Sequence, residues 1–142
     1  MTVLVDTGVL YADHDTDAAR HDAASDALET VYDGELGQPY VSDYIYDEAI
    51  TLTLTRGTHT AATQLGERIR GGGSYPSAYE LLRVSAAVFE DAVAVFERYD
   101  DQQLSFTDAT TIALLNRRGL DGVVSFDDDF DGIVDRIRPE TI

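Results

Sequence analysis

Two aspartates stand directly after apolar runs of the kind that form buried strands. Asp6 follows Val3-Leu4-Val5, and Asp127 follows the run Gly-Val-Val-Ser-Phe at residues 122–126. In a parallel α/β sheet, ligands bind beyond the carboxyl ends of the strands. A carboxylate is a costly group to place there only for solvation, so both residues are candidates for a binding or catalytic site.

Two further acids are candidates because of where they fall in predicted helices. Asp108 stands at the start of a helix predicted over 107–118, where Thr107 or Asp108 is expected to be the N-cap. An acid there also has a purely structural use, worth about 0.5–2 kcal/mol. Glu48 falls near the border of the apolar face of another predicted helix, and helical phase alone does not separate it from Asp47. The apolar face of that helix is formed by Ile45, Ala49 and Leu52.

Carboxylates that converge without thiols or imidazoles make an oxygen-only site. The chain has no Cys, and its three histidines are scattered through other segments. A hard site of this kind suits Mg²⁺ or Mn²⁺ and does not suit zinc. The acids repel one another when the site is empty, so a divalent cation resolves an electrostatic conflict. Such a cation can activate water and neutralise charge on a phosphate during in-line displacement.

The elements that must position these acids alternate along the chain. Strands are predicted at 2–5, 38–42, 79–85 and 122–126, and helices at 18–28, 45–52, 58–70, 86–99 and 107–118. Because both terminal strands are apolar throughout, the sheet is expected to be parallel and covered on both faces. The predicted fold class is α/β, a three-layer α/β/α arrangement around a mostly parallel central sheet.

The length predicts a single domain spanning residues 1–142. The glycine-rich segment 70–76 is expected to be a loop, which could hinge two halves of one domain. It is not expected to be a linker, since neither half is long enough for a comfortable core.

The composition indicates an unusual setting. The formal net charge is −17, every basic residue is Arg, and Asp far outnumbers Glu. At about 1 M salt the Debye length falls to about 3 Å and surface repulsion nearly vanishes. This composition resembles that of cytoplasmic proteins of salt-accumulating microbes. No apolar run approaches a membrane span, and the N-terminus lacks the features of a signal peptide, so a cytoplasmic protein is expected.

Four blocks of the sequence together resemble the PIN domain family. They are Val-Asp-Thr-Gly-Val-Leu at 5–10, Ser-Asp-Tyr-Ile-Tyr-Asp-Glu at 42–48, Leu-Ser-Phe-Thr-Asp-Ala at 104–109 and Val-Val-Ser-Phe-Asp-Asp-Asp-Phe at 123–130. Each block is weak alone, but four in this order and at this spacing are fairly specific. The second block favours Glu48 over Asp47. The size and layout resemble the VapC-type toxins of that family.

The resemblance implies an endoribonuclease that cuts single-stranded RNA to leave a 5′-phosphate and a 3′-hydroxyl. It assigns Asp6, Glu48 and Asp108 to Mg²⁺ or Mn²⁺, with Asp127 at a second metal position or on the attacking water. Asp129 competes with Asp127 for this role. Supporting or substrate-contacting hydroxyls are expected at Thr7, Ser42, Thr107 and Ser125. An antitoxin protein and a homodimer are the partners that the resemblance implies.

RNA binding by so acidic a protein requires local basic patches, because phosphate contacts normally come from a basic surface. The arginines considered for such patches are Arg20, Arg56, Arg68, Arg70, Arg117 and Arg118. The competing hypothesis is a non-catalytic PIN-like module that binds RNA or protein. An aspartyl phosphatase is disfavoured because Gly8 stands where a second Asp is usual, and a receiver domain is disfavoured because the chain has no Lys.

Overall fold

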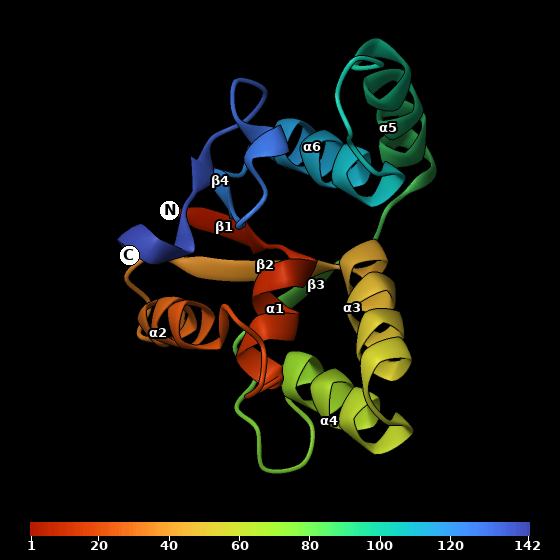
Figure 1. The fold of residues 1–142 in the computed structure, drawn as a ribbon. Coiled ribbons are helices and arrows are strands. Elements are labelled where there is room, and N and C mark those ends of the chain that lie inside the picture. Colours follow the sequence, from red (N-terminus) through yellow and green to blue (C-terminus); the bar gives the residue numbers. More distant parts are fainter.

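The computed structural model describes residues 1–142 around a five-stranded sheet in which every pairing is parallel (Figure 1). The strands lie side by side in the order β3 (Glu80–Leu82), β2 (Gln38–Ser42), β1 (Thr2–Val5), β4 (Gly122–Val124) and β5 (Arg136–Ile137). The predicted parallel sheet is therefore confirmed.

Helices cover both faces of the sheet (Figure 1). On one side lie α5 (Ala86–Arg98) and α6 (Phe106–Arg118). On the other lie α1 (Thr7–His14), α2 (His21–Tyr32) and α4 (His59–Arg70), while α3 (Asp43–Arg56) stands at the carboxyl ends of the strands. This confirms the three-layer α/β/α fold class.

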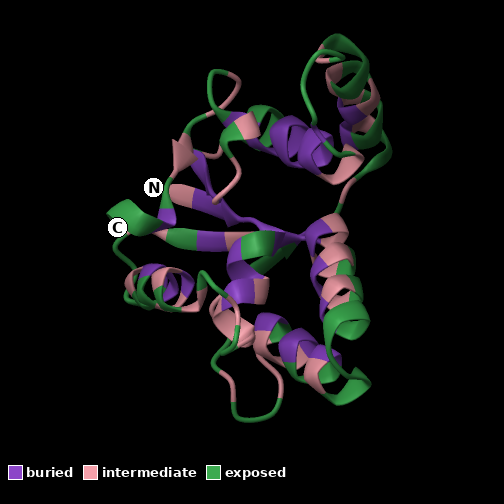
Figure 2. Cartoon of the chain, viewed as in Figure 1, coloured by how far each residue is buried: buried purple, intermediate pink, exposed green.

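The central strand β1 is buried because it has a neighbouring strand on each side and helices on both faces. Val3, Leu4 and Val5 are fully buried, as are Val123 and Val124 of β4. Figure 2 shows the buried residues concentrated along the sheet and the helix faces turned toward it. Strands that are buried on both faces have continuous apolar sequences without alternation. For this reason the strands at 2–5 and 122–126 could be predicted from the sequence.

The order of the strands reverses between β1 and β4. From β1 the chain adds β2 and then β3 toward one edge, whereas β4 and β5 build the other edge. In open α/β sheets, the crevice beyond the carboxyl ends at such a reversal is where ligands bind. The residues that follow β1 and β4 are thus the ones placed to form a site.

Two elements lie outside the predicted set. α1 contains Thr, Gly and β-branched Val in only eight residues, so its local propensity is weak and packing against α2 and α3 maintains it. β5 is only two residues long and is paired with β4. Strands this short have no periodicity to detect.

Several predicted boundaries are corrected by the structure. β4 ends at Val124, two residues earlier than predicted, since β5 offers partners only to Val123 and Val124. β3 covers only three residues of the predicted 79–85. α2 begins at His21, after a turn in which the amide of His21 donates to the carbonyl of Ala18.

Two helices end at glycines, in agreement with the predicted boundaries of the helices at 58–70 and 107–118. α4 ends at Gly71 and α6 at Gly119, both in the left-handed region, with φ of 75° and 65°. At Gly71 a Cβ would lie 2.7 Å from the Cα of Ser77, so the loop returns too closely for any side chain. The glycine-rich segment after α4 is a loop.

None of the helices combines the length and the apolar character needed to cross a membrane.

Candidate active site

The site begins where β1 and β4 end side by side. Val5 pairs with Val124, so the next residues on the two strands, Asp6 and Ser125, are neighbours at the carboxyl edge. The hydroxyl of Ser125 donates to Oδ2 of Asp6 at 2.7 Å and accepts from the amide of Asp127 at 3.0 Å. One buried serine therefore orients acids from both strands.

Asp6 is a buried carboxylate with no cation beside it. It is 8% exposed and precedes α1, but its side chain makes no capping hydrogen bond. The pKa of its carboxyl is raised to about 7, chiefly by burial and in part by the charges of Asp108 and Glu48. The hydrogen bonds from Ser125 and from the amide of Thr7 act in the opposite direction.

Asp108 serves the helix and the site together. The amide of Ser105 donates to its Oδ2 at 3.1 Å and its own amide donates to the hydroxyl of Ser105 at 3.0 Å, forming a capping box. The prediction that Thr107 or Asp108 is the N-cap was wrong, since Ser105 has that role. Burial raises the pKa of Asp108 to about 6, and the charges of Asp127 and Glu48 contribute to the increase.

Glu48 is the acid of α3 that faces the site. It is half-buried, whereas the neighbouring Asp47 is exposed. The charge of Glu48 raises the pKa of both Asp6 and Asp108. Because electrostatic influence falls off with distance, these effects indicate that Asp6, Glu48 and Asp108 lie near one another and that Asp127 lies near Asp108.

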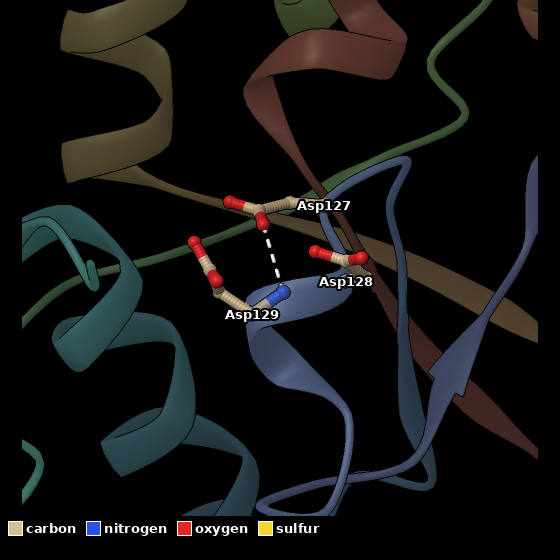
Figure 3. Close-up of side chains that lie close together, drawn as sticks. All are labelled: Asp127, Asp128 and Asp129. Carbon is tan, nitrogen blue, oxygen red and sulfur yellow. Dashed lines mark hydrogen bonds between the residues drawn. The ribbon is translucent and has the colours of Figure 1, made fainter. Parts of the chain in front are cut away.

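Asp127, Asp128 and Asp129 form a second, shallower group at a short 3₁₀ turn, Asp128–Phe130 (Figure 3). Carboxylate oxygens of all three lie within 4.8 Å of one another, and the amide of Asp129 donates to Oδ1 of Asp127 at 2.9 Å. Burial, Asp127 and Asp128 raise the pKa of Asp129. Asp127 links this group to the deeper acids, because its charge acts on Asp108.

The four hydroxyl residues have different surroundings. Ser125 contacts Asp6 directly, and Thr7 is buried beside Asp6 with a hydroxyl that has no hydrogen-bond partner. The hydroxyl of Ser42 instead caps α3 by accepting from the amide of Ile45 at 3.0 Å. Thr107 is half-buried in the first turn of α6.

A groove of about 690 Å³ opens from Asp6 and Asp127. Its walls include Arg20 and Arg56, two of the six arginines considered for basic patches. Two of the other four are engaged elsewhere, Arg68 with Asp13 and Arg117 with Asp91. Two aromatic residues, Tyr11 and Phe126, also line the groove. Tyr11 was not predicted there because α1 was not recognised as a helix, and Phe126 was assigned only to the strand predicted at 122–126.

The donor set fits a hard divalent cation. Asp6, Glu48, Asp108 and Asp127 offer only carboxylate oxygens, and none of the four has an ion-pair partner. The next residue after Asp6, Thr7, is also buried, and its hydroxyl has no hydrogen-bond partner. These features favour Mg²⁺-like ions over zinc.

A model of the PIN domain family matches residues 3–135, which include every acid of this site. The chain belongs to the PIN domain family. The resemblance carried by the four sequence blocks is thus confirmed over nearly the whole chain.

Named relatives of this PIN domain come from Mycobacterium tuberculosis. Ribonuclease VapC26 is 29% identical over 115 residues, which cover 81% of this chain and 78% of the relative. The 23S rRNA-specific endonuclease VapC20 is 29% identical over 140 residues, which cover 97% of this chain and 99% of the relative.

Solved structures agree with this assignment. The crystal structure of Mycobacterium tuberculosis VapC20, described as a sarcin-ricin loop cleaving toxin, superposes with a TM-score of 0.78 at 27% identity, covering 90% of this PIN domain and 92% of VapC20. A toxin-antitoxin complex from Klebsiella pneumoniae shares the fold, with a TM-score of 0.67 at 20% identity and 99% of each chain covered.

Proposed function

We propose that this PIN domain is a divalent-metal-dependent endoribonuclease that cuts single-stranded RNA as the toxin of a toxin–antitoxin pair. The observation that carries the proposal is the convergence of acids from β1, α3, α6 and the turn after β4 with no cation to neutralise them. The names of VapC26 and VapC20, a ribonuclease and an rRNA endonuclease, support RNA as the substrate.

Asp6, Glu48 and Asp108 would hold the metal, with Asp127 as the fourth acid and Asp129 behind it. Asp127 is favoured over Asp129 because its charge acts on Asp108 and its amide is bonded to the same serine as Asp6. A bound Mg²⁺ or Mn²⁺ supplies positive charge that stabilises the phosphate as negative charge develops on it.

The half-buried Asp127 is the acid best placed to receive a proton from water. In the proposed reaction the oxygen of that water attacks phosphorus and the bond from phosphorus to O3′ breaks. The water proton passes to the Asp127 carboxylate, and O3′ takes up a proton from solvent, leaving a 5′-phosphate and a 3′-hydroxyl. Ser125 keeps Asp6 and the backbone of Asp127 in register during this step.

The setting of the protein is part of the proposal. Residues 1–142 act as one domain in the cytoplasm of a salt-accumulating cell, in keeping with the Lys-free, Asp-rich composition and the net charge of −17. The description of VapC20 as a toxin supports an antitoxin partner. A homodimer is proposed on the same analogy.

The test is cleavage of end-labelled single-stranded RNA by the purified protein in molar KCl. Mn²⁺ and Mg²⁺ are compared with EDTA, and Asp6→Asn, Glu48→Gln and Asp108→Asn are compared with the wild type. Asp47→Asn is the matched control, because it removes an exposed acid one position from Glu48.

Metal-dependent cutting that survives in Asp47→Asn and is lost in the three site variants supports the nuclease. If folded wild-type protein cuts no RNA with either metal, the proposal fails and the non-catalytic PIN-like module takes its place. Cutting that persists in EDTA would overturn the metal requirement alone.

A further inference from the structure

Four small residues are among those that line the groove beside the acids. Gly8, Ala12, Ala18 and Ala19 line it, and the exposed Gly8 lies two residues from Asp6. A Cβ added at Gly8 would meet no atom within 4 Å, so a side chain there extends into open space. The groove therefore has room for a planar group next to the proposed metal ligands.

Two arginines lie over aromatic rings in the walls of this groove. The guanidinium carbon of Arg20 is 4.8 Å from the ring centroid of Phe126, and that of Arg56 is 5.2 Å from the ring centroid of Tyr11. Neither arginine forms an ion pair, in a chain with 27 acidic residues and only 10 basic ones. Arg20 and Arg56 therefore carry positive charges that no carboxylate neutralises, and they can bind an anionic ligand that enters the groove.

A guanidinium that lies over a ring can still contact a ligand through its face and through its N–H edge. Its outer face stacks on a nucleobase, and its N–H edge donates to phosphate oxygens in pairs. An acidic peptide would use only the edge, whereas single-stranded nucleic acid uses the face and the edge together. The position of Phe126 next to Asp127 brings one such surface to the border of the site.

We propose that Arg20 on Phe126 and Arg56 on Tyr11 form a nucleotide-binding subsite that holds the unpaired RNA nucleotides flanking the scissile phosphate. This inference rests on the proposed ribonuclease function and adds the residues that position its substrate. Arg20 and Arg56 are positioning residues, since neither belongs to the group of acids that surrounds the metal position.

Binding is measured separately from cutting. The Asp6→Asn/Asp108→Asn variant is used as a cleavage-deficient background, and the fluorescence anisotropy of a short labelled single-stranded RNA reports binding in molar KCl. Arg20→Gln and Arg56→Gln are each expected to weaken binding at least about fivefold. Arg98→Gln is the matched control, because Arg98 also lies over a ring, 5.3 Å from the centroid of Tyr99, but on α5.

A second pair of variants tests the shape of the groove. Gly8→Leu fills the open space and is expected to weaken RNA binding at least about tenfold, while Gly8→Ala leaves room and changes binding less than about threefold. Circular dichroism and thermal unfolding confirm that both variants fold. In the otherwise wild-type enzyme, Arg20→Gln and Arg56→Gln are expected to raise KM more than they lower kcat.

Equal losses in the Arg20, Arg56 and Arg98 variants would overturn the subsite, because they would indicate general charge attraction. Unchanged binding in the Arg20 and Arg56 variants would also overturn it. If the wild type cuts RNA and these variants keep its KM, the subsite fails while the ribonuclease stands. If the wild type neither cuts nor binds RNA, both proposals fail.

Discussion

Asp6 is the residue at which the demands of folding and of metal binding conflict most directly. Its carboxyl is buried and lies near two other acids, and its only side-chain hydrogen-bond donor is Ser125. A pKa of about 7, instead of the usual 3.8, means that the metal-free folded protein holds this proton over a range in which the unfolded chain has lost it. Ionisation of Asp6 therefore lowers the free energy of unfolding of the metal-free protein.

This conflict predicts a pH-dependent gain in stability for Asp6→Asn. When the folded pKa is raised, metal-free stability falls as pH rises from about 4 to about 7, because the folded state binds more protons than the unfolded state. The variant, which cannot ionise, is expected to be more stable than wild type at about pH 8 by roughly 2–4 kcal/mol and similar to it at about pH 4 and below. Urea unfolding in EDTA across this range measures the difference. Asp17→Asn, at an exposed position, is the control, and parallel curves for both variants would contradict the prediction.

Ser125 is expected to control the metal site through its two hydrogen bonds. Ser125→Ala removes the donor to Asp6 and the acceptor for the amide of Asp127, so the pKa of Asp6 should rise further and Mn²⁺ affinity should fall about 10- to 100-fold. Calorimetric titration with Mn²⁺ measures the loss. Ser42→Ala is the matched control, because Ser42 is also a fully buried serine at a strand end but its hydroxyl caps α3. The role of Ser125 is refuted if both variants lose affinity equally.

The start of α6 shows how one helix terminus carries both stability and function. Its capping box holds the side chain of Asp108 by the amide of Ser105, so the bond that begins the helix also fixes a proposed metal ligand. The structural interpretation of Asp108 is confirmed, and its role as a metal ligand is the proposal made above. The start of α5 offers a comparison, since Ser85 caps that helix by accepting from the amide of Val88 at 3.2 Å and no acid completes a box there.

The two helix caps predict separable effects. Ser105→Ala and Ser85→Ala are each expected to lower the free energy of unfolding by about 0.5–2 kcal/mol, because each removes the acceptor for an orphan amide. Only Ser105→Ala is expected to reduce cleavage, since the Ser105 hydroxyl accepts from the amide of Asp108 and also hydrogen-bonds its carboxyl, so its loss loosens the turn that positions this acid. Denaturant unfolding and initial cleavage rates, measured under conditions where both variants are folded, compare the two. Equal activity in both variants would show that the cap does not position Asp108.

Across the whole molecule, charge repulsion opposes folding. The net charge of −17 on a 15.5 kDa chain is offset by only four ion pairs, and three of them include an arginine or an acid that is about half exposed or more. Pairs of this kind contribute little to stability. Screening by salt is therefore the main means of reducing the repulsion.

We expect the free energy of unfolding to rise steeply with KCl up to about 1 M, where the Debye length has fallen from about 10 Å to about 3 Å. A variant with Glu97→Gln, Asp100→Asn and Asp101→Asn neutralises three exposed acids at the end of α5 and just after it, and should need less salt for the same stability. Urea unfolding at several KCl concentrations measures both proteins. Stability that is independent of salt in the wild type would contradict the halophilic interpretation.

The fold class was predictable, and the candidate acids could be chosen, because local sequence patterns carry this information. A strand buried on both faces is apolar throughout, so the acid that follows it is conspicuous, and this identified Asp6 and Asp127. The helical pattern before Gly119 located the helix that holds Asp108. The oxygen-only donor set pointed to a hard divalent metal without any knowledge of the fold.

The tertiary structure decided which of these residues meet. Asp6 and Ser125 are separated by 119 positions and become neighbours only because β4 pairs with β1 at the point where the strand order reverses. The burial of Asp6 and the position of Arg20 over the ring of Phe126 arise in the same way. Local periodicity reports which side of an element is buried, but not which distant element covers it. The charged groups and aromatic rings of this site come from segments far apart in the sequence. Which of them come into contact is therefore decided only when the sheet and helices assemble.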